Sequence, residues 1–299
     1  MDLDSNAHLI RIIGSIFAGL LGLAFGSFLN VCVSRWPAGE SIVRPGSHCR
    51  NCEHALAWWE NVPLVSWVVL RGRCRKCGRA ISWRYPLVEL AVGALWAYAA
   101  YTSIPLTADP ELPTAVVVSV LAHGLSQMVL SWLLMALAIL DAENLWLPDF
   151  LTLTGILLGL AVKTLSEGFG YHFDTTPQPL RVLLASLSAI IICAGLILLI
   201  RWLYKLIRHR EGIGLGDAKL MALLAAWLAL PGALLSFFLA AVLGSVVALA
   251  VLAVPAARRE SRSWAASKLP LGAFLCIGGI ISSLWGQQII AGYLHWAGF

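Results

Sequence analysis

Charged side chains are scarce in this chain, and their scarcity argues against an ordinary water-soluble protein. Only 12% of the 299 residues are Asp, Glu, Lys or Arg, whereas 59% are hydrophobic, and the mean hydropathy is +0.81. Soluble domains contain about 25% charged residues. The composition therefore predicts a polytopic membrane protein with an all-α bundle fold, because helices satisfy their own backbone hydrogen bonds inside lipid.

Two common kinds of hydrolase site are also missing. The sequence has no His-Glu-x-x-His string, which disfavours a catalytic zinc protease, and no serine and histidine form a known nucleophile arrangement. No basic surface with interleaved aromatic residues is apparent, so we expect no nucleic-acid partner. Any hydrolytic chemistry must come from other side chains.

Apolar stretches of roughly the length that crosses a bilayer, about 20 residues, recur along the chain. We expect about eight transmembrane helices, at residues 10–33, 87–104, 114–140, 147–166, 180–202, 218–231, 233–254 and 270–294. No small-residue cleavage site follows the first stretch, which favours a retained helix over a signal peptide. Three parts are expected: a first transmembrane helix at 1–33, a cytoplasmic domain at 34–86 and a seven-helix core at 87–299.

The basic residues are unevenly distributed, which predicts the orientation in the membrane. Of the 21 lysines and arginines, nine fall in residues 34–86, five in 201–219 and four in 256–268. By the positive-inside rule these segments face the cytoplasm, where they also contact anionic lipid of the bilayer. The loops near 105–113 and 167–179 contain no Lys or Arg and are expected outside.

Four of the seven cysteines form a metal-binding pattern in the polar segment 34–86. Cys49 and Cys52 form one CxxC pair, and Cys74 and Cys77 form a second. Two such pairs supply four thiolates for a closed tetrahedral zinc site, and a segment of about 50 residues needs such a staple to fold. A dithiol redox pair is the alternative, which the reducing cytoplasm disfavours.

Two acids at the ends of apolar stretches are the candidate catalytic groups. Asp141 follows a long apolar run, and Asp217 ends the string Gly212-Ile-Gly-Leu-Gly-Asp217. Ionisable residues within membrane helices are functional by default. The expected spans and their orientation bring both acids to the cytoplasmic side of the membrane. The pair suggests an intramembrane aspartyl hydrolase; a zinc-ribbon membrane adaptor whose acids merely cap helices is the rival interpretation.

The sequence closely resembles the type IV prepilin peptidase family, the GxGD-type intramembrane aspartyl proteases that are both leader peptidases and N-methyltransferases of pilus and type II secretion systems. The matching strings are Gly26-Ser-Phe-Leu-Asn-Val31, Pro45-Gly-Ser-His-Cys49, Glu60-Asn-Val-Pro-Leu-Val-Ser-Trp67, Arg71-Gly-Arg-Cys74, Arg84-Tyr-Pro-Leu-Val-Glu89, Leu140-Asp141, Leu147-Pro-Asp149 and Gly212-Ile-Gly-Leu-Gly-Asp217-Ala-Lys219. The resemblance implies that Asp141 and Asp217 are catalytic and that the enzyme resides in the bacterial inner membrane. It also implies a prepilin or pseudopilin substrate with a basic leader, cut at the cytoplasmic face, and S-adenosylmethionine as methyl donor.

One string departs from the family, which tends to show Pro-Phe-Gly-Pro where this chain has Pro270-Leu-Gly-Ala273. We expect this change to affect a helix start at the rim and details of substrate docking, and to leave the chemistry untouched. No Gly-rich signature for S-adenosylmethionine appears, so the methyl-donor site has no assigned residues.

The physics of two adjacent carboxyls supports peptide hydrolysis, because like charges a few Å apart leave one group ionised and one protonated. Asp217 opens its expected helix, where the helix dipole favours an anion, whereas Asp141 closes one. We therefore expect Asp217 to act mostly as the base and Asp141 mostly as the acid.

Further residues are weaker candidates for substrate binding. Glu143 and Asp149 could attract a basic leader, although Asp149 is expected first to complement the dipole of its own helix. Gly214 and Gly216 allow a substrate strand to approach the backbone closely, and Lys219 belongs to the same motif. Glu89 could hold a substrate ammonium or could cap a helix.

Overall fold

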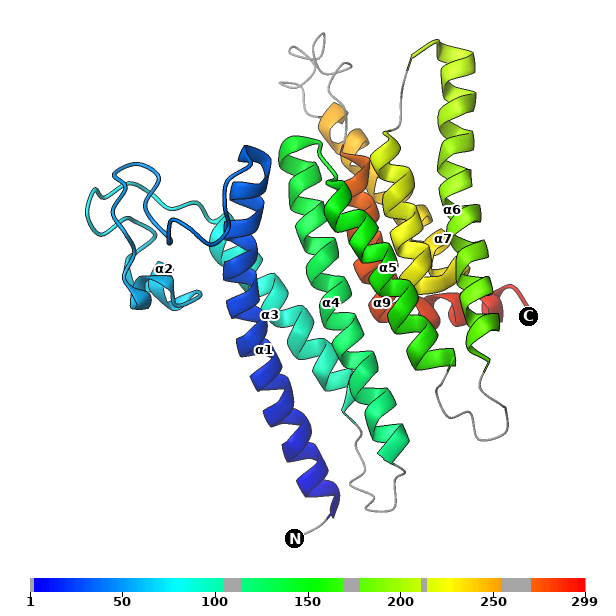
Figure 1. The fold of residues 1–299 in the computed structure, drawn as a ribbon, viewed down its shortest axis with the longest axis horizontal. Helices are drawn as coiled ribbons and strands as arrows, with labels where there is room; N and C mark the ends of the chain where they lie inside the picture. Colours follow the sequence, from blue (N-terminus) through cyan, green and yellow to red (C-terminus); the bar gives the residue numbers. More distant parts are fainter. Residues whose placement is uncertain (1–2, 105–113, 169–177, 211–213, 254–269, 299) are drawn as a thin grey trace. The chain divides into compact units, whose positions relative to one another are not determined.

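A computed structural model describes residues 3–104, 114–168, 178–210, 214–253 and 270–298 (Figure 1). Its elements are α1 (Leu3–Arg35), η1 (Trp36–Ala38), η2 (Trp58–Asn61), α2 (Val65–Val69), α3 (Arg84–Ser103), α4 (Thr114–Asn144), α5 (Asp149–Gly168), α6 (Pro179–Arg208), α7 (Leu215–Ala253) and α9 (Leu271–Trp296). The described ranges contain no β-strand, only two isolated bridges. The predicted all-α fold is confirmed.

Some expectations concern residues outside these ranges. They are the external loop at 105–113, most of the loop at 167–179, the basic segment at 256–268 and the first glycine of the Gly-rich motif, Gly212. The chain divides into two compact units, Met1–Trp132 and Leu133–Phe299. The three-part division at residues 33 and 86 stays a prediction.

In the first unit, α1 and α3 pack as an antiparallel pair along a seam of glycines. A Cβ added at Gly22 would lie 2.9 Å from the Cα of Gly93, and one added at Gly26 would lie 2.7 Å from the Cα of Glu89. Residue numbers rise along α1 as they fall along α3, so the helices run in opposite directions. Glycine permits this close backbone approach, which is a common way for helices to pack in a membrane.

In the second unit, α7 consists of two helical legs that lie along α9. Ala229 breaks the helix with φ 57 and ψ −178, and Pro231 follows it. Before the break, Leu224 contacts Gly279; after it, Ser236 contacts Gly278. The first leg runs parallel to α9. Its start, beside Asp217, lies near the start of α9, and Leu224 lies beside Gly279, further along α9. The second leg runs antiparallel, because the site of Gly244 contacts Phe274, earlier in α9 than the partner of Ser236.

The chain therefore turns back at residues 229–231, and Figure 1 shows the two ends of α7 on the same side of this unit. Backbone strain at Ala229 and the missing amide hydrogen of Pro231 explain the break. The two expected spans at 218–231 and 233–254 correspond to the two legs.

Six helices in the described ranges are long and apolar enough to cross a membrane, compared with the eight spans expected. Two features account for the difference. The six include α7 as one helix although it has two legs, and α3 is not among them although its 20 residues pair with α1 over most of their length. The multi-pass membrane architecture agrees with the prediction.

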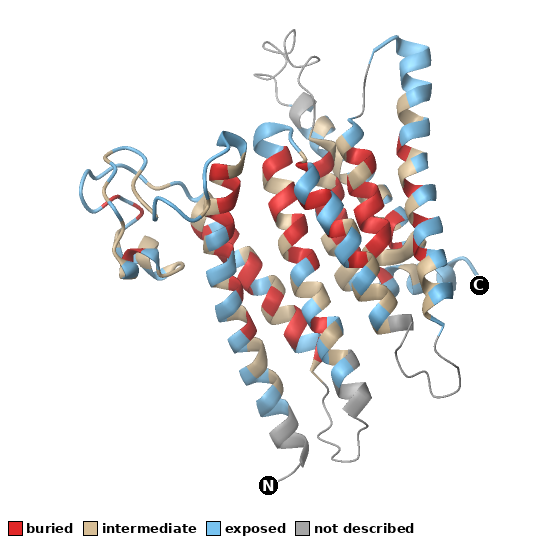
Figure 2. Ribbon diagram, in the orientation of Figure 1, coloured by how far each residue is buried: buried red, intermediate tan, exposed pale blue. Residues whose placement is uncertain are grey.

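The core of the second unit lies where α4, α7 and α9 meet. The side chains of Leu134, Leu137, Leu220, Leu224 and Leu275 have no exposed surface. Figure 2 shows this concentration of buried residues, and shows that the last turns of α6 are exposed instead. The candidate catalytic acids lie at one end of this core.

Candidate active site and metal centre

Asp141 lies in the last turn of α4 and is buried, with 6% of its surface exposed. Its Oδ2 accepts a hydrogen bond of 2.8 Å from the backbone N–H of Ala273, the third residue of α9. A Cβ added at Gly272 would lie 2.8 Å from the same oxygen. The carboxyl group therefore occupies the space that a side chain at position 272 would need.

The string Pro270-Leu-Gly-Ala273 forms a helix start, as expected, with Pro270 at the N-cap of α9. The string also lies closer to a candidate catalytic acid than the sequence indicated, and its expected lack of effect on the chemistry stays a prediction. Gly272 and Ala273 contact the Asp141 carboxyl directly. Nothing in the sequence indicated this contact, because 132 residues separate its two partners.

Asp217 is the third residue of α7 and is also buried, with 8% of its surface exposed. Its Oδ2 accepts a hydrogen bond of 3.0 Å from the backbone N–H of Gly214. A carboxylate three residues into a helix that accepts the N–H preceding the helix is one half of a capping box. The Gly-rich motif thus folds back onto its own aspartate.

Leu147, between α4 and α5, connects the surroundings of the two acids. Its Cδ1 lies 3.1 Å from the Cβ position of Gly216 and 3.0 Å from that of Gly272. The Asp141 and Asp217 carboxyls interact electrostatically, and the fully buried Cys276 of α9 interacts with both. The second unit therefore brings the two predicted acids into one site.

The dipole argument for their roles loses its premise in this geometry. Asp217 lies at the start of α7, as expected, but Asp141 lies at the start of α9 as well as at the end of its own helix. Both carboxyls accept backbone N–H groups at helix N-termini, which favour negative charge.

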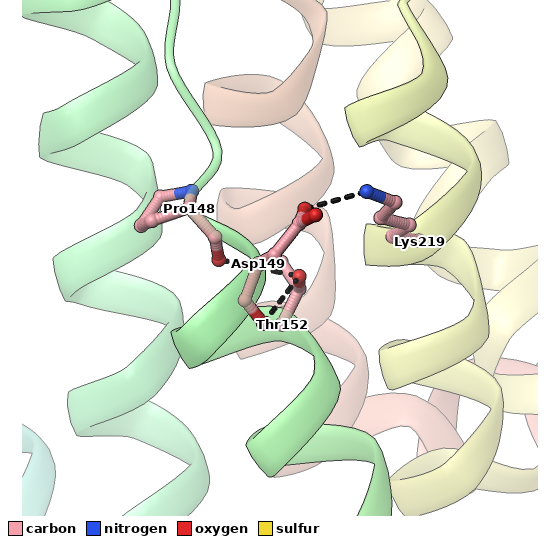
Figure 3. A network of polar contacts seen from close by, with 4 residues as sticks. All are labelled: Pro148, Asp149, Thr152 and Lys219. Carbon is pink, nitrogen blue, oxygen red and sulfur yellow. Dashed lines mark hydrogen bonds and ion pairs between the residues drawn. The ribbon is translucent and has the colours of Figure 1, made fainter.

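Asp149 and Lys219 form an ion pair beside this site (Figure 3). Asp149 is the first residue of α5, and its Oδ1 lies 2.5 Å from the Nζ of Lys219 in the first turn of α7. Thr152 donates its hydroxyl to the Pro148 carbonyl at 3.2 Å in the same turn. Of the two acids considered for attracting the leader, Asp149 is paired with Lys219. The other, Glu143, is exposed in the last turn of α4.

Glu89 lies in the other compact unit, in the second turn of α3. It is buried, and its Oε2 accepts a hydrogen bond of 2.8 Å from the backbone N–H of Leu64. The carboxyl of Glu89 thus ties the segment after η2 to α3. Leu64 is the N-cap residue of α2, so Glu89 accepts an N–H at the start of that helix, and its role as an ammonium site stays a prediction.

The four cysteines of the first unit form a cluster that could hold a metal ion. The Sγ atoms of Cys49, Cys52, Cys74 and Cys77 all lie within 4.8 Å of one another. Two pairs are 3.9 Å apart, Cys49 with Cys77 and Cys52 with Cys74. Four sulfurs around one zinc ion would be about 3.8 Å apart, given a Zn–S distance of about 2.3 Å. The donor set and its spacing fit zinc.

The two CxxC segments are a structural repeat with one hydrogen-bonding scheme. In the first, Cys49 N–H donates to the His54 carbonyl at 2.9 Å, and Glu53 N–H donates to the Cys49 carbonyl at 2.8 Å. In the second, Cys74 N–H donates to the Arg79 carbonyl at 2.8 Å, and Gly78 N–H donates to the Cys74 carbonyl at 2.9 Å. Each segment therefore forms the same tight turn around its cysteines.

The turns favour the thiolate form of one cysteine in each pair. The backbone N–H of Arg79 is the main cause that lowers the pKa of Cys77 to about 6, and the N–H of Asn51 lowers the pKa of Cys49. The N–H of His54 lowers the pKa of Cys52, but burial and the neighbouring thiols together raise it to about 11. Thiolates are the form that binds metal.

Three residues of the active site were not predicted from the sequence: Leu147, Gly272 and Ala273. In the sequence, Leu147 was noted only within the string Leu147-Pro-Asp149. Gly272 and Ala273 were noted only within the string that differs from the family pattern. The one signal that could have found them is the conjunction of a Gly with a helix start, which marks a place where another group approaches the backbone closely.

Comparison with known proteins agrees with this picture. Residues 20–103 match the bacterial peptidase A24 N-terminal domain, and residues 128–249 match the type IV leader peptidase family. No solved structure matches the chain.

Three curated relatives carry the name prepilin leader peptidase/N-methyltransferase. That of Stutzerimonas stutzeri is 33% identical, over 93% of this chain and 93% of its own length. That of Pseudomonas putida is 34% identical, over 94% of each chain. That of Burkholderia pseudomallei strain 1026b is 38% identical, over 90% of this chain and 85% of its own length. With similarity of this extent over nearly its whole length, the chain belongs to the type IV leader peptidase family.

Proposed function

We propose that this protein cleaves the basic leader of prepilins or pseudopilins at the cytoplasmic face of the bacterial inner membrane, and methylates the new N-terminal amine. The observation that carries the peptidase proposal is the placement of Asp141 and Asp217, two buried carboxyls that interact at one end of the α4, α7 and α9 core. The names and extent of the relatives support both activities.

Hydrolysis by this pair needs one ionised and one protonated carboxyl. The ionised group takes a proton from water, whose oxygen then bonds to the scissile carbonyl carbon, while the protonated group donates its proton to the carbonyl oxygen. Collapse of the resulting diol breaks the C–N bond, and the amine leaves with a proton from the dyad. The backbone N–H groups of Gly214 and Ala273 hold the two carboxyls in place through the cycle.

Zinc is the metal that we propose for the cluster of Cys49, Cys52, Cys74 and Cys77. When bound, it would supply a structural cross-link between the two turns, since four protein ligands leave no open position for chemistry. S-adenosylmethionine is the methyl donor that the family implies. No contact among the described residues identifies its site, so no residue is assigned to methyl transfer.

The test uses purified full-length protein in lipid with a prepilin-like peptide, read by mass spectrometry for loss of the leader and gain of a methyl group. Asp141→Asn and Asp217→Asn should each abolish cleavage, because either change removes one of the two proton positions. Glu40→Gln, at an exposed acid of the first unit, is the isosteric control and should cleave normally.

A peptide that already lacks its leader separates the two activities. Both aspartate variants should still methylate this peptide, because no peptide bond has to be broken in it. Cleavage that survives either aspartate change would refute the proposal and favour the adaptor interpretation.

A further inference from the structure

The first turn of α9 is built around the Asp141 carboxyl. Ala273 donates its backbone N–H to Oδ2 at 2.8 Å, and this bond is buried. At Gly272 the nearest atoms to an added Cβ are Oδ2 and Cγ of Asp141, at 2.8 and 2.9 Å. Real Cβ atoms essentially never come this close to another heavy atom, so any side chain at 272 would displace the carboxyl.

The bond satisfies both of its partners. The first four N–H groups of a helix have no partner within the helix, and Ala273 is the third residue of α9. A buried carboxylate needs donors in place of water. An N–H at a helix start supplies both a hydrogen bond and the positive end of the helix dipole.

Two other titratable groups interact with Asp141 in the described ranges. They are Asp217, from α7, and Cys276, one turn further along α9. Negative charge on either group opposes ionisation of Asp141, and the N–H of Ala273 acts in the opposite direction.

We propose that the first turn of α9 positions Asp141 for catalysis and favours its ionised form, through the N–H of Ala273 and the missing side chain of Gly272. With Oδ2 held by this N–H, Oδ1 is the oxygen left to exchange a proton during the reaction. The inference rests on the proposed function of the dyad and adds two positioning residues to it.

Ala273→Pro removes the N–H that Oδ2 accepts, puts a ring carbon in its place, and introduces the proline that the family tends to show at this position. Proline has no N–H, and the first turn of a helix tolerates it because no intrahelical bond is lost there. We expect the acidic limb of the pH profile of kcat/KM to move toward higher pH by about one unit, equivalent to about 1.4 kcal/mol. Ala273→Gly keeps the N–H, and its acidic limb should stay where it is in the wild type.

Gly272→Ala tests the space for the carboxyl and keeps every N–H. We expect kcat to fall by about 100-fold, as displacements of about 1 Å at a catalytic group do, while KM stays within about twofold. If Ala273→Pro does not fold, as judged by thermal unfolding, this variant decides the question. A normal kcat for Gly272→Ala then overturns the proposal.

The outcomes separate this inference from the function on which it rests. If Asp141→Asn is inactive but folded Ala273→Pro has the acidic limb of the wild type, the dyad stands and the positioning role is wrong. If Asp141→Asn cleaves normally, the proposed function itself fails. A shift of equal size in Ala273→Pro and Ala273→Gly would also overturn the proposal, because the N–H would then not be its cause.

Discussion

The two CxxC turns have the same hydrogen bonds but different residues at one equivalent position. This difference predicts that a substitution there will change the affinity for zinc. The residue four positions after the first cysteine of each turn has a left-handed backbone. In the second turn it is Gly78, with φ 68, and in the first it is Glu53, with φ 56. Glycine adopts this conformation without a steric penalty, whereas other residues do not. Glu53→Gly should therefore relieve strain, and Gly78→Glu should introduce it.

The magnitude follows from the cost of a left-handed residue. A side chain costs about 1–2 kcal/mol in this conformation, and the entropy that glycine loses on ordering offsets about 0.5–1 kcal/mol of the gain. A net effect of about 1 kcal/mol changes an equilibrium constant about fivefold. Because metal binding and folding of such a domain are coupled, the strain relieved in the turn adds to the binding free energy of zinc.

The assay is competition for zinc between the full-length protein in detergent and a chelator of known affinity. Glu53→Gly should hold zinc about fivefold more tightly than the wild type, and Gly78→Glu about fivefold less tightly. Glu53→Gln is the matched control, because it removes the charge and keeps the strain. Equal affinities for Glu53→Gly and Glu53→Gln would attribute any gain to charge, and no gain at all would refute the strain argument.

Three further predictions concern other contacts. Reversing one partner of the Asp149–Lys219 pair, as in Lys219→Asp, should lower cleavage, and the double variant with Asp149→Lys should restore most of it; failure of the swap to rescue would show that Lys219 acts on something other than Asp149. Cys74→Ser should reduce the bound zinc, measured by mass spectrometry, by more than about tenfold. As the control, metal-free wild type should regain its zinc on dialysis against a zinc solution. A variant with full zinc content would exclude Cys74 as a ligand. Gly26→Ala should lower the free energy of unfolding by about 1–3 kcal/mol through overpacking against α3, whereas Gly195→Ala, with no neighbour within 4 Å of its added Cβ, should not; equal melting temperatures would argue against the seam.

The sequence alone predicted the membrane bundle and the metal cluster because both depend on local pattern. An apolar run long enough to span lipid must be helical, since no water is present to satisfy its backbone. The CxxC pairs needed only their spacing, because a tight turn brings two thiols together whatever surrounds it. The two legs of α7 were expected as separate spans, 218–231 and 233–254, and Pro231 lies at the end of the first.

Which groups surround each acid could not be derived in this way. Asp141 and Asp217 are identifiable as acids at the ends of apolar runs, and the hydrogen bond from Gly214 to Asp217 is local. The N–H that holds Asp141 comes from Ala273, at the start of a helix whose position is set by packing along both legs of α7. The identity of residue 273 does not predict this contact, because the donor is a backbone N–H. The need for glycine at 272 is equally invisible in the sequence, because the Asp141 carboxyl occupies the space of its side chain.

The helices, the two CxxC turns and the identity of the two acids could all be predicted from residue order, since each follows from hydrophobicity, spacing or charge along a short stretch of chain. The folded chain was needed to show that the start of α9 supports Asp141, that Lys219 pairs with Asp149 and that Leu147 lies against the glycines beside both acids. These contacts join segments far apart in the sequence, and their geometry is fixed by the close packing of whole helices, which no local pattern records.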